Sequence, residues 1–190
     1  MILPGMEQSA YAIAIGIDRG TNNSIVLSLQ FSVSSDDTDG QSSSTETVSV
    51  QAANIDSGIS LINSHIGKRV NLSHAKVIVI SSELAYTGVS EYIYTLANNI
   101  QVRPNTNIII SRGNASDFLD KSIPTLEDLS ARYYNIILNS SRYTGHSDNI
   151  ELSQFYSRIL DSSREASAIL RRFKWRWWFR YHRISSIQGR

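Results

Sequence analysis

The sequence predicts an α+β domain whose mixed β-sheet combines an antiparallel meander with one βαβ unit and carries helices packed on it. Residues 77–80 and 108–110 are apolar runs rich in β-branched residues and without alternation, which is typical of strands buried on both faces. Between them, apolar residues recur at helical spacing over residues 89–100. A strand, a helix and a strand within about 40 residues form a βαβ unit, so the two strands are expected to be parallel.

The N-terminal part of the chain predicts the antiparallel meander. Residues 10–17 form an apolar run, and residues 25–33 and 47–52 alternate apolar and polar side chains, which is the period of a strand with one wetter face. A turn over residues 18–22 joins the first two strands, and its glycine is free to take a positive φ. A loop rich in Ser, Asp and Gly, residues 34–44, leads to the third strand.

The sequence also predicts helices, from apolar residues at helical spacing and from residues that favour helix ends. The helix inside the βαβ unit has an apolar stripe that runs through Val89, Ile93, Leu96, Ala97 and Ile100. The other predicted helices run from Ser57 to near Gly67, from Asn114 (with Asp117 as its capping partner) through Leu119, from Thr125 to near Tyr143, and over residues 151–160.

Composition limits the chemistry that this chain can carry. Its 190 residues are 41% hydrophobic and 18% charged, which fits one globular domain. There is no cysteine, which excludes disulfides, thiolate nucleophiles and zinc–thiolate sites, and no apolar run is long enough to span a bilayer. Residues 171–190 hold seven of the 18 Lys and Arg residues and no acid, so the remainder has 11 basic and 17 acidic groups and a net charge of −6. A basic surface covering the whole chain, as nucleic-acid binding needs, is therefore not expected.

Two groups of polar residues resemble catalytic or metal-binding patterns only in part. Residues 35–40 with Glu46 have some of the spacing of a calcium-binding loop, but Ser35 fills the first ligand position and strands flank the segment, so we interpret it as a solvated loop. His74 stands beside the start of the buried strand and is interpreted as a hydrogen-bonding residue at the strand edge, not as a base. The histidines never pair at metal-ligand spacing, and no nucleophile elbow, phosphate loop or dinucleotide fingerprint occurs. No enzyme activity, metal or cofactor is predicted.

Arg103 and Asn105 are the candidate residues for contact with a partner protein. They flank Pro104 where the crossover ends and a strand begins, and loops in such positions often carry recognition. The structural alternative is that Pro104 stops the preceding helix while Arg103 and Asn105 bond local carbonyl groups. The sequence does not choose between these two interpretations.

Several segments, in their order along the chain, resemble one known family. This family is the C subunit of GerA-type spore germinant receptors, the GerAC or Ger(x)C lipoproteins, and the resemblance is to its N-terminal domain. It rests on AIAIGIDRG (12–20), SHAKVIVI (73–80), ELA with a following glycine (83–88), VRPNT (102–106) and SRGNASDFL (111–119). The likeness extends over residues 10–170, which we predict to be the domain.

The resemblance implies a non-enzymatic subunit of a receptor that acts in nutrient-triggered germination of a spore-forming bacterium. Its partners would be membrane-spanning receptor subunits of the A and B types, with no nucleic acid and no cofactor. The family is normally held at the outer face of the spore inner membrane by a lipid on a cysteine near the mature N-terminus. This chain has no cysteine, and residues 1–9 are too short for a signal peptide, so we expect them to be the remnant of a leader. An unrelated small-ligand or protein-binding α/β module is the alternative.

Residues 171–190 are predicted to lie outside the domain. They hold all three tryptophans, interleaved with arginine, a composition that can stack on bases or settle at a membrane interface. The family has a glycine-rich segment at this point, and glycine codons read one base early become arginine and tryptophan codons. We therefore interpret the tail as the product of a shifted reading frame, with a functional cationic tail as the alternative.

Overall fold

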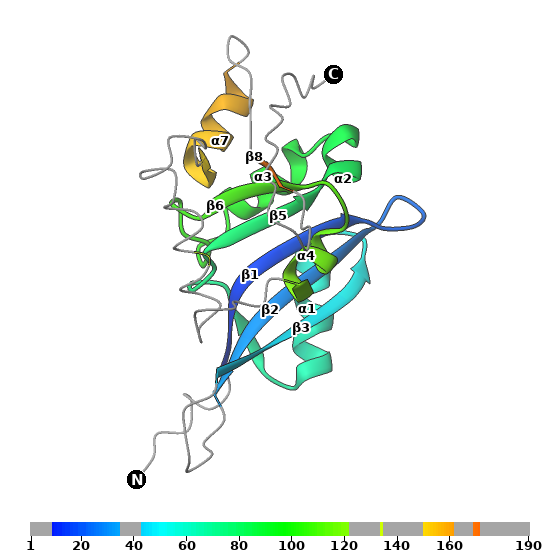
Figure 1. Ribbon diagram of the computed structural model, residues 1–190, viewed down its shortest axis with the longest axis vertical. Helices are drawn as coiled ribbons and strands as arrows, with labels where there is room; N and C mark the ends of the chain where they lie inside the picture. The colour runs from blue at the N-terminus through cyan, green and yellow to red at the C-terminus, as the bar shows by residue number, and fades with distance from the viewer. Residues whose placement is uncertain (1–8, 35–42, 122–133, 135–149, 162–168, 172–190) are drawn as a thin grey trace.

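The computed structural model describes residues 9–34, 43–121, 134, 150–161 and 169–171 (Figure 1). These residues form a mixed sheet of eight strands in the order β3-β2-β1-β5-β6-β7, in which β4 also pairs with β1 and β8 also pairs with β6. Helices pack against both faces of the sheet. The predicted α+β class with a mixed sheet is confirmed.

The first three strands form the predicted antiparallel meander. They are β1 (Ser9–Arg19), β2 (Ile25–Ser34) and β3 (Ser43–Ala52). In the turn between β1 and β2, Asn22 and Asn23 take positive φ, of 52° and 60°, and Gly20 does not. Asparagine tolerates the left-handed region better than most residues. Glycine is needed at position 20 for space, since a Cβ there would overlap Ser24.

The βαβ unit has the predicted parallel strands. β5 (Val77–Ser81) pairs with β6 (Asn107–Ser111) in parallel, and β5 is buried over its whole length. Ile78 and Ile80 face one side of the sheet, while Val77 and Val79 face the other, so both faces of this strand are covered. β5 also pairs in parallel with β1, which makes the first strand of the chain an interior strand of the sheet.

The crossover between β5 and β6 is not the single helix predicted. It contains α2 (Ser82–Thr87) and α3 (Ser90–Ala97), separated at Gly88, whose φ of 112° is incompatible with a helix. The predicted apolar stripe is correct for Ile93 and Leu96, which are buried. It is wrong for Ile100, which is 100% exposed, because α3 has already ended when the chain reaches it.

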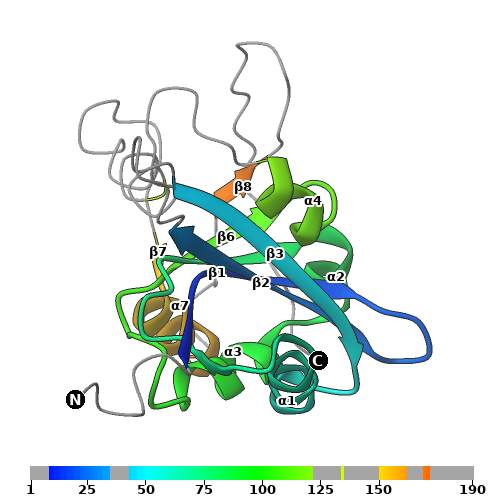
Figure 2. The ribbon, with the colours of Figure 1, turned by 90° about the horizontal axis from the view of Figure 1, so that it is seen from below.

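Two hydrophobic layers lie on opposite faces of the sheet. The larger layer is covered by α1 (Ile55–Ile66), α2, α3 and α7 (Leu152–Leu160). The smaller layer is covered by α4 (Ala115–Lys121) together with Tyr134. Figure 2 shows α1, α3 and α7 below the sheet and α4 above it. α1 begins two residues before Ser57, because Asn54 and Ser57 form a reciprocal capping box, and it ends as predicted at Gly67, which has φ 64°.

A buried carboxylate near the end of β1 holds the start of α4. Asp18, which is 5% exposed, accepts hydrogen bonds from the backbone N–H groups of Ala115 at 2.5 Å and Ser116 at 2.9 Å. The sequence pointed to Asn114 and Asp117 at the start of this helix, and the structure shows that two N–H groups of the first turn are also bound by a side chain of β1. At the other end of α4, Gln30 Nε2 donates to the carbonyl of Leu119 at 2.8 Å.

The short strands lie at positions that the sequence did not predict. β4 (Arg69–Asn71) pairs in parallel with the start of β1, and the outer edge of β6 is shared by β7 (Ile150–Glu151) and β8 (Ile169–Arg171). The predicted helix over residues 151–160 is confirmed as α7. The predicted helix from Thr125 and the calcium-like loop fall outside the described residues, except that Glu46 is an exposed residue of β3.

Candidate functional site

The candidate site is the crossover loop, residues 98–106, which connects α3 to β6. Its chain path is fixed by local backbone hydrogen bonds, including Val102 N–H to the carbonyl of Asn99 and Thr106 N–H to the carbonyl of Arg103, both at 3.0 Å. The side chain of Gln101 reaches across to the segment after β4, where its Oε1 accepts from the N–H of Leu72 at 3.1 Å. Val102 and Thr106 are buried. The loop is therefore anchored at several points between the two elements that it joins.

Helix α7 supplies a second anchor from a distant part of the sequence. The N–H of Ser153 donates to the carbonyl of Pro104 at 3.0 Å, and the N–H of Leu152 donates to the carbonyl of Thr106 at 2.8 Å. These are N–H groups of the first turn of α7, which have no acceptor within their own helix. The crossover loop thus caps α7 and in return is held in one conformation by it.

The two side chains predicted to contact a partner are exposed on this anchored loop. Arg103 and Asn105 both point to solvent, and within the part of the chain that the structure describes neither side chain makes a hydrogen bond or an ion pair. The structural alternative, in which these side chains bond local carbonyl groups, is not what the structure shows. Pro104 does not stop the helix either, because α3 ends at Ala97, well before it.

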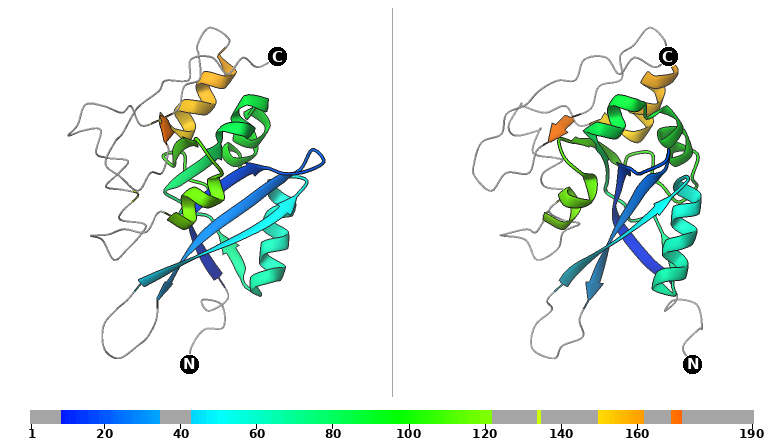
Figure 3. Two further views of the ribbon diagram at one scale, coloured as in Figure 1. Left: turned by 45° about the vertical axis from the view of Figure 1, so that its right-hand side comes forward. Right: turned by 90° about the vertical axis from the view of Figure 1, so that its right-hand side faces the viewer.

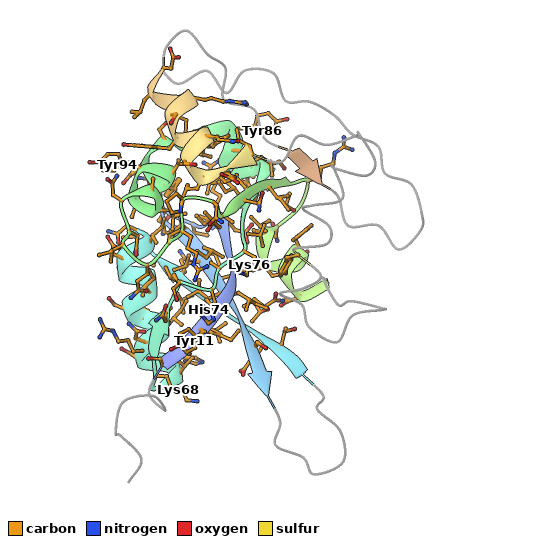
Figure 4. The ribbon with its side chains drawn as sticks, turned by 90° about the vertical axis from the view of Figure 1, so that its left-hand side faces the viewer. Tyr11, Lys68, His74, Lys76, Tyr86 and Tyr94 are labelled. Carbon is orange, nitrogen blue, oxygen red and sulfur yellow. The ribbon has the colours of Figure 1, made fainter. Side chains whose placement is uncertain are left out.

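Apolar and aromatic side chains are also exposed on this loop and on the helices that adjoin it. Ile100 is fully exposed in the same loop, and Tyr94 on α3 is 58% exposed. The ring of Tyr94 meets that of Tyr156 on α7, with centroids 6.2 Å apart and planes tilted by 56°. Figure 4 shows Tyr94 projecting outward from its helix. We refer to Tyr94, Ile100, Arg103, Asn105 and Tyr156 as the crossover-loop surface.

Electrostatics add little to this surface. The neighbouring Tyr92 is partly buried, and this burial, with a smaller effect from the adjacent Glu91, raises the pKa of the Tyr92 hydroxyl above its ordinary value of 10.0. The phenol therefore remains neutral at physiological pH. The polar recognition groups of the surface are the guanidinium of Arg103, with five N–H donors, and the amide of Asn105, which both donates and accepts.

The other residues considered from the sequence do not join this site. His74 is exposed and stacks on Tyr11, with ring centroids 4.6 Å apart, so the predicted hydrogen bond at the strand edge is wrong for the described residues. No three His, Cys, Asp or Glu residues gather as metal ligands among the residues that the structure describes. In the same residues, no helix is long and apolar enough to cross a membrane.

Sequence reasoning missed the aromatic and apolar part of the surface. Ile100 was assigned to a buried stripe, although the Asn98–Asn99 pair before it signals the end of a helix and could have corrected this. Tyr94 and Tyr156 come together only because α3 and α7 pack side by side, which no local pattern predicts.

These features define a class of protein, an α+β domain with an open mixed sheet that presents an anchored, exposed loop suited to recognition. The chain matches the family described as the spore germination protein N-terminal domain over residues 5–173. It therefore belongs to this family, as the resemblance in its sequence implied, and to the proteins of spore germination. No curated protein and no solved structure matches it.

Proposed function

We propose that this chain is a non-enzymatic subunit of a spore germinant receptor, which contributes to nutrient-triggered germination by assembling with membrane-spanning subunits of the A and B types. Membership in the spore germination family supports both a role in germination and the assignment to a germinant receptor. The scattered placement of the described titratable residues, with no cluster of metal-ligating groups among them, supports association over catalysis. In this proposal the receptor, and this chain with it, lies at the outer face of the spore inner membrane.

The crossover-loop surface is the proposed contact with a partner subunit. The observation that carries this proposal is that Ile100 and Arg103 are exposed on a loop that is held from three sides, by α3, by the segment after β4 and by α7. An anchored loop loses little conformational entropy on binding, so its exposed side chains contribute more of their contact energy to affinity. Arginine and tyrosine are also among the residue types that dominate binding energy at protein interfaces.

Substitution of Arg103 by alanine tests this proposal. The variant is expected to fold normally, because the side chain makes no interaction within the described structure, and to reduce co-purification with the partner subunits by about tenfold or more, as for an interface arginine worth about 1.4–2 kcal/mol. Nutrient-triggered germination of spores carrying the variant should fall in parallel. The matched control is Arg112→Ala, which removes another exposed arginine, from the loop after β6.

Three results would contradict the proposal. An unfolded Arg103→Ala variant would mean that the residue is structural. Equal losses for the Arg112→Ala control would mean that general charge, not this loop, supports assembly. Normal assembly and germination with Arg103→Ala combined with Ile100→Asp would leave the loop without a role in partner binding.

A further inference from the structure

One part of the chain is locally basic although the body is acidic. Between Asp56 and Glu83 there is no Asp or Glu, and this stretch contains three Lys and Arg residues and two histidines. These residues are His65, Lys68, Arg69, His74 and Lys76. All except Lys76 are classed as exposed, and Lys76 is partly exposed. The stretch begins in α1 and ends at β5, so its charges are concentrated at the C-terminal end of α1, in β4 and in the segment after β4.

Strand pairing places Arg69 on the same surface as the start of β1. The pairing of β1 with β2 begins only at Ala12. The three residues of β1 before it pair with β4 instead, through Ser9↔Arg69, Ala10↔Val70 and Tyr11↔Asn71. Figure 3 shows β2 and β3 diverging from β1 toward this end. Val70 and Ala10 turn into the core, so the alternation of side chains puts Arg69 and Tyr11 together on the outer face, with Cα atoms roughly 8 Å apart.

An aromatic pair lies next to these cations. Tyr11 is 43% exposed and stacks on His74, with an interplanar angle of 22°. Lys76 lies two residues after His74 in the sequence, and its backbone N–H donates to the carbonyl of Ile13 at 2.8 Å, which fixes this segment against β1. Figure 4 shows Lys68, Tyr11, His74 and Lys76 along one side of the molecule, with Lys68 and Tyr11 toward the end where β1 begins.

We propose that this basic end, made of His65, Lys68, Arg69, His74, Lys76 and Tyr11, rests on the surface of an anionic phospholipid bilayer. The charge is complementary to anionic headgroups, each of which can be met by a Lys or Arg. Tyr11 adds an apolar ring with a polar hydroxyl, the combination that settles at a membrane–water interface. Lys68, Tyr11, His74 and Lys76 face the same side of the molecule (Figure 4), so a surface that approaches this side can contact all four. The proposal goes beyond the receptor role above and does not depend on it.

Helix α1 offers a competing explanation for part of this charge. His65 lies in its last turn and Lys68 follows its Gly67 cap, where cations offset the partial negative charge of a helix end. That explanation predicts a loss of stability when the cations are removed, and it makes no use of Arg69, Tyr11 or the His74 ring. The two explanations therefore separate when membrane binding and thermal stability are measured on the same variants.

The experiment uses the full chain with the seven Lys and Arg residues of 171–190 changed to glutamine, so that the tail does not bind lipid itself. Binding is measured by co-sedimentation with vesicles of phosphatidylcholine containing 30% phosphatidylglycerol, and with pure phosphatidylcholine vesicles. Lys68→Gln with Arg69→Gln is the test variant. Arg19→Gln with Arg112→Gln is the matched control, because it removes the same charge from two other exposed positions.

The tail-neutralised chain is expected to bind the anionic vesicles and not the pure phosphatidylcholine vesicles. Its affinity should fall roughly 30-fold in the test variant, because each membrane-facing cation contributes about a factor of five to the affinity. In the control variant the affinity should fall less than twofold. The thermal unfolding midpoint should change by no more than a few degrees. The proposal is overturned if the tail-neutralised chain does not bind the anionic vesicles, or if both variants lose binding equally. It is also overturned if the test variant loses stability but keeps its lipid binding, or if duplex DNA is bound in preference to the vesicles.

Discussion

Two isoleucines at the extremes of exposure allow a direct test of the fold. Ile80 is 0% exposed in β5, and Ile100 is 100% exposed in the crossover loop. Truncation of Ile80 to alanine removes three carbon atoms from the larger hydrophobic layer, and at about 0.8 kcal/mol per buried methylene this transfer costs about 2.4 kcal/mol. The cavity left behind adds to that cost, so the expected total is about 3–4 kcal/mol, within the usual range for buried isoleucine.

The same substitution at Ile100 removes the same atoms from solvent. The free energy of unfolding should then change by less than about 0.5 kcal/mol, as for other surface substitutions. Both variants are measured by urea denaturation followed by far-UV circular dichroism, with the slope of the transition compared between them. The assignment of β5 to the sheet interior would be refuted by a cost below about 1 kcal/mol for Ile80→Ala. A similar loss of unfolding free energy for Ile100→Ala would indicate that Ile100 is buried, as in the single long helix that the sequence predicted.

Two further predictions concern a polar contact and a titrating side chain. Asp18→Ala should destabilise the protein by about 2–3 kcal/mol, because two N–H groups of α4 lose a charged acceptor. The control, Asp120→Ala, lies at an exposed position of the same helix and should cost little. Equal losses of unfolding free energy in the two variants would contradict the capping role of Asp18. The raised pKa of Tyr92 means that the fold favours its neutral form, so this contribution to stability is present below pH 10 and is lost as pH rises through the folded pKa. Tyr92→Phe should therefore flatten the decline of the unfolding free energy above pH 10, and an unchanged pH profile would contradict this.

The parts of the fold that the sequence predicted correctly have strong local signals. The uninterrupted β-branched residues of β5 and β6 indicate strands covered on both faces, and the alternation in β2 and β3 indicates the meander. β4 and β8 are three residues long, which is too short for any periodicity to appear. The break at Gly88 was hidden because apolar residues on both sides of it happen to continue at helical spacing.

Long-range contacts account for the rest of the difference. Asp18 and α4 are separated by nearly 100 residues, so no local pattern could show that one caps the other. Arg103 and Asn105 were placed correctly in an exposed loop at the start of a strand, but their anchoring by α7 depends on hydrogen bonds to Pro104 and Thr106 from a helix far along the chain. Their contact with a partner stays a prediction, as do the domain limits at residues 10 and 170.

The central position of β1 and the late closure of β6 together constrain how the chain can fold during synthesis. β1 is synthesised before the other strands, and its second edge stays unpaired until β5 has been made. The outer edge of β6 pairs only with residues 150–151 and 169–171, which are synthesised later still. Such pairings between distant segments form slowly, since each one must first close a long loop. During translation the meander would therefore expose the open edge of β1 until β5 has left the ribosome, and the outer edge of β6 would then stay unpaired until residues 150–171 follow.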